Sequence, residues 1–134
     1  MPPVLVVDAQ PIVALVRGEP GAARANTRLV DALGSGSVVM SAVNWCEVMY
    51  LIRRYAGPRA AAGVAARLER MPIAVVDVDV SLAGFAAALK SDHRLGLGDS
   101  FAAALAMMTK LPLLTADADF LPLAQHGLKL DWLG

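Results

Sequence analysis

The sequence predicts an α/β domain with a mostly parallel sheet that is covered by helices on both faces. Two observations carry this prediction. Segments typical of strands alternate with segments typical of helices, and the strand segments are apolar throughout. Fully apolar strands are typical of parallel sheets that are buried on both faces, as in three-layer α/β/α folds. We therefore expect a sheet of four or five strands, with a ligand site at the carboxyl ends of the strands.

Each element has a local signal in the sequence. The apolar runs VLVV, SVVM, IAVVDV and LPLLT predict strands, and GLKLDWL predicts a short fifth strand. The helical segments carry apolar residues at intervals of three or four, and several end at glycine. Ser41 is expected to cap the third helix and Ser81 the fifth. The predicted strands span 4–7, 37–40, 73–78, 111–115 and 127–133, and the predicted helices span 11–17, 21–34, 42–56, 58–71, 81–92 and 99–110.

Length and composition fit a single domain over residues 1–134. The chain is 57% hydrophobic and 18% charged, which allows a sizeable core. No apolar run reaches the roughly 18 residues of a membrane span, and the start MPPVLVVDAQ lacks the basic region of a signal peptide. We therefore expect a cytoplasmic protein without a membrane segment. A single cysteine, Cys46, excludes an internal disulfide, and its apolar helix predicts that it is buried.

The charges are unevenly distributed, although the formal net charge is zero. Residues 53–70 contain five arginines and one acid, a local charge of +4, whereas residues 71–134 contain four basic and seven acidic groups, a local charge of −3. A solvated helix face is the usual explanation of such a basic run. A surface that contacts phosphates is the alternative if a nuclease site lies nearby.

Four acidic residues stand where a site forms in such a fold: Asp8, Glu47, Asp99 and Asp117. The first and the last follow predicted strands, the third opens a helix after LGLG, and Glu47 lies on a nearly apolar helix. Each has a structural explanation by itself. Asp8 and Asp99 can cap helices, Asp117 and its neighbour Asp119 can form a turn, and Glu47 can reach water or pair with Arg54.

Taken together, the four acids predict a metal site. Converging carboxylates repel one another, so they take up protons or bind a multivalent cation. His93 and His126 are far apart in the sequence and show no zinc-ligand spacing with the single cysteine. Ligation by carboxylates alone selects hard cations such as Mg²⁺ or Mn²⁺. A cation of this kind activates water for hydrolysis of a phosphodiester.

The strings VVDAQPIVALV, SAVNWCEVMYLI, LGLGDSFAAALA and LLTADADF carry these acids in the order Asp, Glu, Asp, Asp. In order and spacing they resemble the PIN domain and, more narrowly, the VapC toxins of bacterial toxin–antitoxin pairs. The resemblance covers residues 4 to about 131. It implies a compact α/β/α PIN-like fold and a Mg²⁺-dependent endoribonuclease toxin that cleaves structured RNA, either transfer RNA or ribosomal RNA.

The resemblance also implies roles for single residues. Asp8, Glu47, Asp99 and Asp117 fall on the four acidic positions of the family and are expected to be catalytic, with Asp8, Asp99 and Asp117 as metal ligands.

Four further residues are expected to support them: Asp119, Thr115, Asn44 and Gln10. Thr115 is the hydroxyl residue that commonly precedes the fourth acid. Asn44 can hold a water or the substrate, or it can be a merely exposed position of its helix. Gln10 departs from the family, because a small hydroxyl residue is usual at that position.

As partners, the resemblance implies a VapB-type antitoxin that covers the acidic pocket, an RNA substrate and a second copy of the chain in a homodimer. The helix 42–56, with Trp45, Met49 and Tyr50, and the alanine-rich helix after it provide surface for such contacts. The alternative is that these side chains belong to the core.

Other phosphoryl-transfer folds fit less well. Asp8-Ala9-Gln10 lacks the second acid of the haloacid-dehalogenase motif, and the early acidic pair of a response-regulator receiver is absent. A PIN-like module that binds a partner without catalysis is the remaining alternative, favoured only by Gln10.

Overall fold

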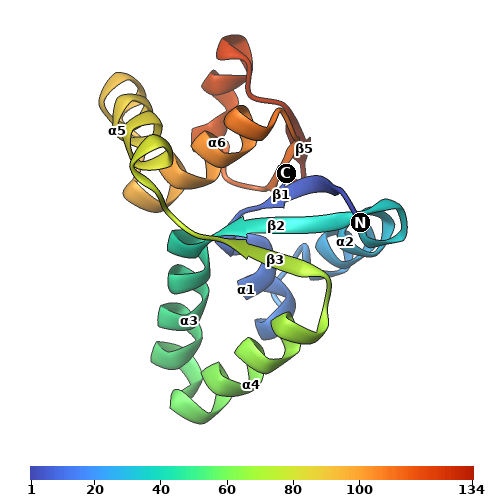
Figure 1. Ribbon diagram of the computed structural model, residues 1–134. Helices are drawn as coiled ribbons and strands as arrows, with labels where there is room; N and C mark the ends of the chain where they lie inside the picture. The colour runs from blue at the N-terminus through green and yellow to red at the C-terminus, as the bar shows by residue number, and fades with distance from the viewer.

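The computed structural model describes residues 1–134 and contains a five-stranded sheet in the order β3-β2-β1-β4-β5 (Figure 1). Every neighbouring pair of strands is parallel. The predicted α/β fold with a parallel sheet is thus confirmed, and all five strands are present. The strands are β1 (Pro3–Val7), β2 (Ser37–Ser41), β3 (Ile73–Val76), β4 (Leu113–Thr115) and β5 (Leu130–Trp132). The helices are α1 (Ala9–Arg17), α2 (Ala22–Ser35), α3 (Ala42–Ala56), α4 (Pro58–Arg70), α5 (Val80–His93), α6 (Leu97–Thr109) and the 3₁₀ helix η1 (Ala118–His126).

Helices cover both faces of the sheet because the strands are apolar on both sides. Leu5 and Val7 of β1 pack into one core with α1 to α4, whereas Val6 between them packs into a second core with α5, α6 and η1. In β4, Leu114 belongs to the first core and Leu113 to the second. Successive side chains of a strand point to opposite faces, so an unbroken apolar run supplies two cores.

The order of the strands reverses between β1 and β4. The connections from β1 to β2 and from β2 to β3 run through α1 to α4 on one face, and the connection from β3 to β4 runs through α5 and α6 on the other (Figure 1). The carboxyl ends of β1 and β4 therefore border the crevice where open α/β sheets bind ligands. Asp8 follows β1 directly, and Thr115 ends β4.

The first helix begins earlier than predicted, at Ala9, and the fourth and fifth strands begin later, at Leu113 and Leu130. Three further local predictions were wrong. The third strand ends at Val76, because Asp79 caps α5 by accepting a hydrogen bond from the Leu82 N–H; the predicted cap Ser81 already lies within that helix. Helix α6 begins at Leu97, so Asp99 lies in its first turn instead of capping it. Cys46 is exposed on α3, because it lines the open groove between α3 and α4 instead of packing into the core.

Two other features of the chain were not anticipated. Residues 118–126 form η1, although Pro122 removes a backbone donor there. The chain also requires a glycine at position 36, because a side chain there would collide with the carbonyl oxygen of Pro2 and with Val4.

No helix combines the length and the apolar character needed to cross a bilayer.

Candidate metal centre

Asp8 lies between the end of β1 and the start of α1, where it caps the helix. Its side chain is only 4% exposed. One carboxylate oxygen accepts a hydrogen bond from the Ala9 N–H at 2.9 Å and the other accepts one from the Thr115 hydroxyl at 3.0 Å. Burial, and then the negative charge of Asp99, raise the pKa of Asp8 from 3.8 to about 7, although both hydrogen bonds act in the opposite direction. The cost of burying the charged carboxylate therefore outweighs its stabilisation by the two hydrogen bonds.

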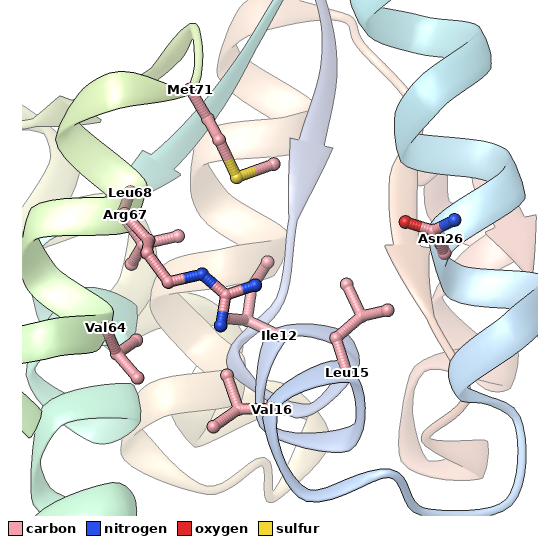
Figure 2. Close-up of a pocket in the computed structure, with 8 residues that line it drawn as sticks. All are labelled: Ile12, Leu15, Val16, Asn26, Val64, Arg67, Leu68 and Met71. Carbon is pink, nitrogen blue, oxygen red and sulfur yellow. The ribbon is translucent and has the colours of Figure 1, made fainter. Parts of the chain in front are cut away.

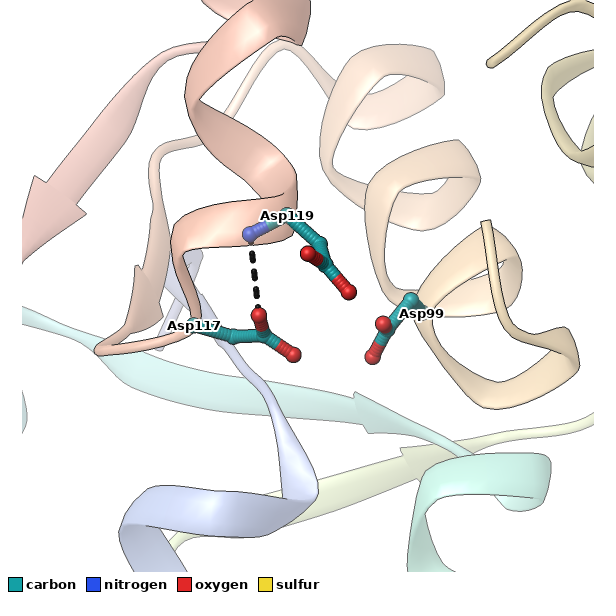
Figure 3. A group of neighbouring side chains, drawn as sticks. All are labelled: Asp99, Asp117 and Asp119. Atoms are coloured by element: carbon teal, nitrogen blue, oxygen red, sulfur yellow. Dashed lines mark hydrogen bonds between the residues drawn. The ribbon is translucent and has the colours of Figure 1, made fainter. Parts of the chain in front are cut away.

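Three further carboxylates form a group, and one of them, Asp99, acts electrostatically on Asp8. Asp99 projects from the first turn of α6, and Asp117 and Asp119 project from the start of η1 (Figure 3). One oxygen of each lies within 4.8 Å of the others. Asp117 is fixed by its backbone, because its N–H donates to the Thr115 hydroxyl at 3.0 Å and its carboxylate accepts from the Asp119 N–H at 2.9 Å. Thr115 thus joins Asp8 to the turn that carries the other two acids.

The close approach of like charges is visible in Asp99. Burial, followed by the charges of Asp117, Glu47 and Asp119, raises the pKa of Asp99 from 3.8 to about 6. A group of this kind is stabilised by protons or by a cation, and all its donor atoms are carboxylate oxygens. Such a donor set fits Mg²⁺ or Mn²⁺ and does not fit the sulfur and nitrogen preferences of zinc.

Glu47 reaches the site from α3, where it is partly buried. Its Oε1 accepts a hydrogen bond from Nδ2 of Asn44 at 2.8 Å, and Arg54, considered above as its ion-pair partner, instead donates to the hydroxyl of Tyr50. Burial raises the pKa of Glu47, and the Asn44 hydrogen bond opposes that shift. Asn44 itself is fully buried, so it is not the exposed helix position that its polar side chain would suggest.

Two placements differ from what the sequence indicated. Asp119, expected beside the site, belongs to the tight group of three, whereas Asp8 lies outside that group. Gln10 is exposed and lines a small cavity with Ala116 and Leu133, without a hydrogen bond to any of the acids. The spacing of two residues between Asp117 and Asp119 was the available signal for the first difference, because an aspartate at a turn accepts a hydrogen bond from the backbone N–H two residues on, as Asp117 does here.

Sequence reasoning also missed Gly98, the residue before Asp99. A side chain at Gly98 would overlap the carboxylate of Glu47, so the two elements α3 and α6 meet closely here. The signal was the second glycine of LGLGD, which has no turn to explain it because Gly98 is already helical.

A separate cavity of about 130 Å³ lies between α1, α2 and α4 (Figure 2). Its walls are mainly aliphatic, with Arg67 and Asn26 as the polar side chains at its edge. No acid and no nucleophile lines it. It is a gap in the packing between helices and offers no chemistry of its own.

The basic run lies away from the acids. Five exposed arginines occupy the end of α3 and α4: Arg53, Arg54, Arg59, Arg67 and Arg70. Helix α3 starts at the site and spans 15 residues, so at about 1.5 Å per residue its last turn stands roughly 20 Å from its first.

The two histidines, although far apart in the sequence, are neighbours in space, with the ring centroids of His93 and His126 4.8 Å apart.

The comparisons with known proteins agree with this geometry. Residues 5–125 match the family model of the PIN domain. The chain is 35% identical over 124 residues to a VapC ribonuclease of Mycobacterium bovis and, equally, to ribonuclease VapC42 of Mycobacterium tuberculosis; each match covers 87% of this chain and 92% of the relative.

Solved structures share the fold at lower identity. VapC20 of Mycobacterium tuberculosis, described as a sarcin-ricin loop cleaving toxin, superposes with a TM-score of 0.77 at 21% identity, over 92% of this chain and 95% of that one. VapBC2 of Rickettsia felis bound to a promoter DNA fragment gives 0.76 at 13% identity, over 96% and 97%. Sequence identity, family model and fold agree, and the chain therefore belongs to the PIN domain family, within its group of VapC ribonucleases.

Proposed function

We propose that this protein is the Mg²⁺-dependent endoribonuclease toxin of a VapBC-type toxin–antitoxin pair and hydrolyses phosphodiester bonds in structured RNA. The observation that carries the proposal is the group formed by Asp99, Asp117 and Asp119, whose oxygens lie within 4.8 Å of one another beside the buried Asp8. Repulsion among such carboxylates is relieved when a divalent cation binds.

Asp8, Asp99 and Asp117 would hold the cation, with Asp119 available as a fourth carboxylate. When bound, Mg²⁺ or Mn²⁺ would supply a nucleophilic water and stabilise the charge that develops on the phosphate. Thr115 holds the Asp8 carboxylate in place and orients Asp117 through its backbone. Asn44 occupies Oε1 of Glu47, which leaves Oε2 to take a proton from water.

The phosphate at the cleaved bond of the RNA would reach the acidic group, and more distant phosphates would contact the exposed arginines on α3 and α4. Only seven of the 134 residues are aromatic, so base stacking contributes little and RNA shape would decide the choice of substrate. The similarity of the fold to VapC20, a toxin that cleaves the sarcin-ricin loop, supports structured RNA as the substrate class.

The cognate partner would be a VapB-type antitoxin, as in the toxin–antitoxin complexes among the solved structures. A mainly apolar groove between α3 and α4, lined by Trp45, Met49 and Tyr50, provides a docking surface for the antitoxin or for a second copy of the chain. Trp45 and Met49 also pack against the first core, so a role in the core and a role in this surface are compatible.

The decisive experiment is RNA cleavage by the purified protein. We expect cleavage of transfer or ribosomal RNA with Mg²⁺ or Mn²⁺ and none with EDTA. Asp99→Asn should lower the rate by roughly a hundredfold or more, because it removes one carboxylate of the proposed site. Asp31→Asn, an exposed acid on α2, is the matched control and should leave the rate unchanged.

The same variants can be tested in cells. Expression of the wild-type protein without its antitoxin should arrest growth, and Asp8→Ala or Asp99→Ala should relieve the arrest. Toxicity that persists in both variants, together with weak Mn²⁺ binding, would instead support the partner-binding module that Gln10 suggests.

A further inference from the structure

Asn44 is a completely buried side chain with every polar group paired. Its Oδ1 accepts from the Ser41 hydroxyl at 2.6 Å, while its Nδ2 donates to Oε1 of Glu47 at 2.8 Å and to the carbonyl oxygen of Gly98 at 3.0 Å. A carbonyl and a carboxylate can only accept, so the amide cannot be turned the other way. Ser41 reinforces this orientation, because its oxygen accepts from the Asn44 backbone N–H and its proton goes to Oδ1. The amide is therefore fixed between α3 and the start of α6.

Gly98 also lies directly against the Glu47 carboxylate. A Cβ at this position would overlap both oxygens and the carboxyl carbon of Glu47. The backbone of Gly98 is ordinary helix and has no positive φ, so the conflict of a side chain there is with the Glu47 carboxylate and not with the backbone conformation. The Glu47 carboxylate thus occupies the volume that a side chain at Gly98 would fill, next to Asp99.

The carboxylate also lies at a favourable electrostatic position. Helix α6 has no side-chain cap, since its N-cap residue is Gly96. The first turn of a helix attracts negative charge because its N–H groups are unpaired. This attraction and the hydrogen bond from Asn44 hold the Glu47 carboxylate in place, and the missing side chain of Gly98 leaves room for it beside Asp99.

We propose that Asn44 and Gly98 are positioning residues of the nuclease site: the amide of Asn44 tethers the Glu47 carboxylate, and the missing side chain of Gly98 admits it beside Asp99. The part of this inference that concerns RNA cleavage rests on the proposed function. Its geometric part, the coupling of residue 98 to Glu47, can be measured in the metal-free protein.

The first test is Gly98→Ala with Gly84→Ala as the matched control. Both glycines lie in helices, and a Cβ at Gly84 meets nothing within 4 Å. Alanine is the better helix former, so neither change should lower the melting temperature. We expect Gly98→Ala to reduce RNA cleavage by roughly tenfold to a hundredfold, as misplacement by about 1 Å does, and Gly84→Ala to leave it unchanged.

The second test separates displacement of Glu47 from an effect on helix α6. Glu47→Asp shortens the side chain, so its carboxylate no longer lies over residue 98. In that background Gly98→Ala should change cleavage by less than about twofold, because the collision has been removed. An equal loss in both backgrounds would overturn the proposal, and so would an unchanged rate in the wild-type background.

A third measurement does not depend on RNA. The pKa of Glu47, followed by carboxyl NMR in the metal-free protein, should fall toward its ordinary value in Gly98→Ala because the carboxylate moves into solvent. It should rise further in Asn44→Leu, because the charged form loses its hydrogen bond. A Glu47 pKa that is unchanged in Gly98→Ala would refute the inference, even if the protein cleaves RNA. If the pKa moves as expected but no variant cleaves RNA, the proposed function fails and the geometric coupling stands.

Discussion

The carboxyl edge of the sheet and the cavity between α1, α2 and α4 differ in almost every physical respect. The edge gathers Asp8, Asp99, Asp117 and Asp119 and raises the pKa of two of them. The cavity is lined by aliphatic side chains such as Ile12, Val64 and Leu68. The first region is destabilised by like charges, and the second contributes the hydrophobic contacts that keep the helices on the sheet. The comparison teaches that a cavity alone does not identify a site, whereas a group of carboxylates with raised pKa values at the strand ends does.

The largest effect should come from enlarging the apolar cavity. Leu68 is 6% exposed, and Leu68→Ala should lower the free energy of unfolding by about 3 kcal/mol, because it removes buried contacts and widens an existing gap. Chemical denaturation measures this change. Mn²⁺ affinity, measured by calorimetry, should stay within twofold, since no metal-site residue contacts the cavity.

Val30→Ala provides the control, because Val30 is 59% exposed on α2 and its truncation should hardly change the free energy of unfolding. If Leu68→Ala weakened Mn²⁺ binding strongly, the two regions would not be independent.

The second effect concerns the pH dependence of stability. The pKa of Asp8 is raised to about 7 in the folded protein from 3.8, so the folded state binds more protons than the unfolded state between these values. The stabilisation is fully present below pH 3.8 and is lost as the pH rises through about 7. Between pH 5 and pH 8 the metal-free protein should lose roughly 2 to 3 kcal/mol of stability through Asp8, and Asp99 acts in the same direction.

Thermal melts across this pH range test the sign. Mg²⁺ should flatten the trend by compensating the charges, and Asp8→Asn should remove most of it because asparagine does not titrate. A metal-free protein whose melting temperature rises from pH 5 to pH 8 would contradict the assignment.

The smallest effect lies outside both regions, at the start of α5. Asp79→Ala should cost about 1 kcal/mol of stability, because Asp79 accepts the hydrogen bond from the Leu82 N–H. Ser81→Ala should cost less than about 0.5 kcal/mol, because Ser81 is an exposed residue inside the helix. Denaturant melts of the two variants compare them directly, and a larger loss for Ser81→Ala would mean that the cap is wrongly assigned. RNA cleavage should not change in either.

Much of the site was predictable because its residues lie at element boundaries. Asp8 and Asp117 follow strands whose apolar runs are visible in the sequence, and parallel strands bring their carboxyl ends to one edge. The boundary of α5 was less predictable, because Asp79 and Ser81 are both good capping residues and only the backbone path selects one of them.

By itself, the sequence determined the alternation of strands and helices, the double-sided burial of the strands and the order of the acids, because these depend on local periodicity and on residue chemistry. Only the tertiary structure decided that Asp119 joins Asp99 and Asp117, that Asn44 bridges Glu47 and Gly98, and that Asp8 is buried enough for its pKa to reach about 7. These features depend on distances between segments that lie up to about a hundred residues apart in the chain. Such distances are set by how α3, α6 and η1 pack on the sheet, and no local pattern of residues records them.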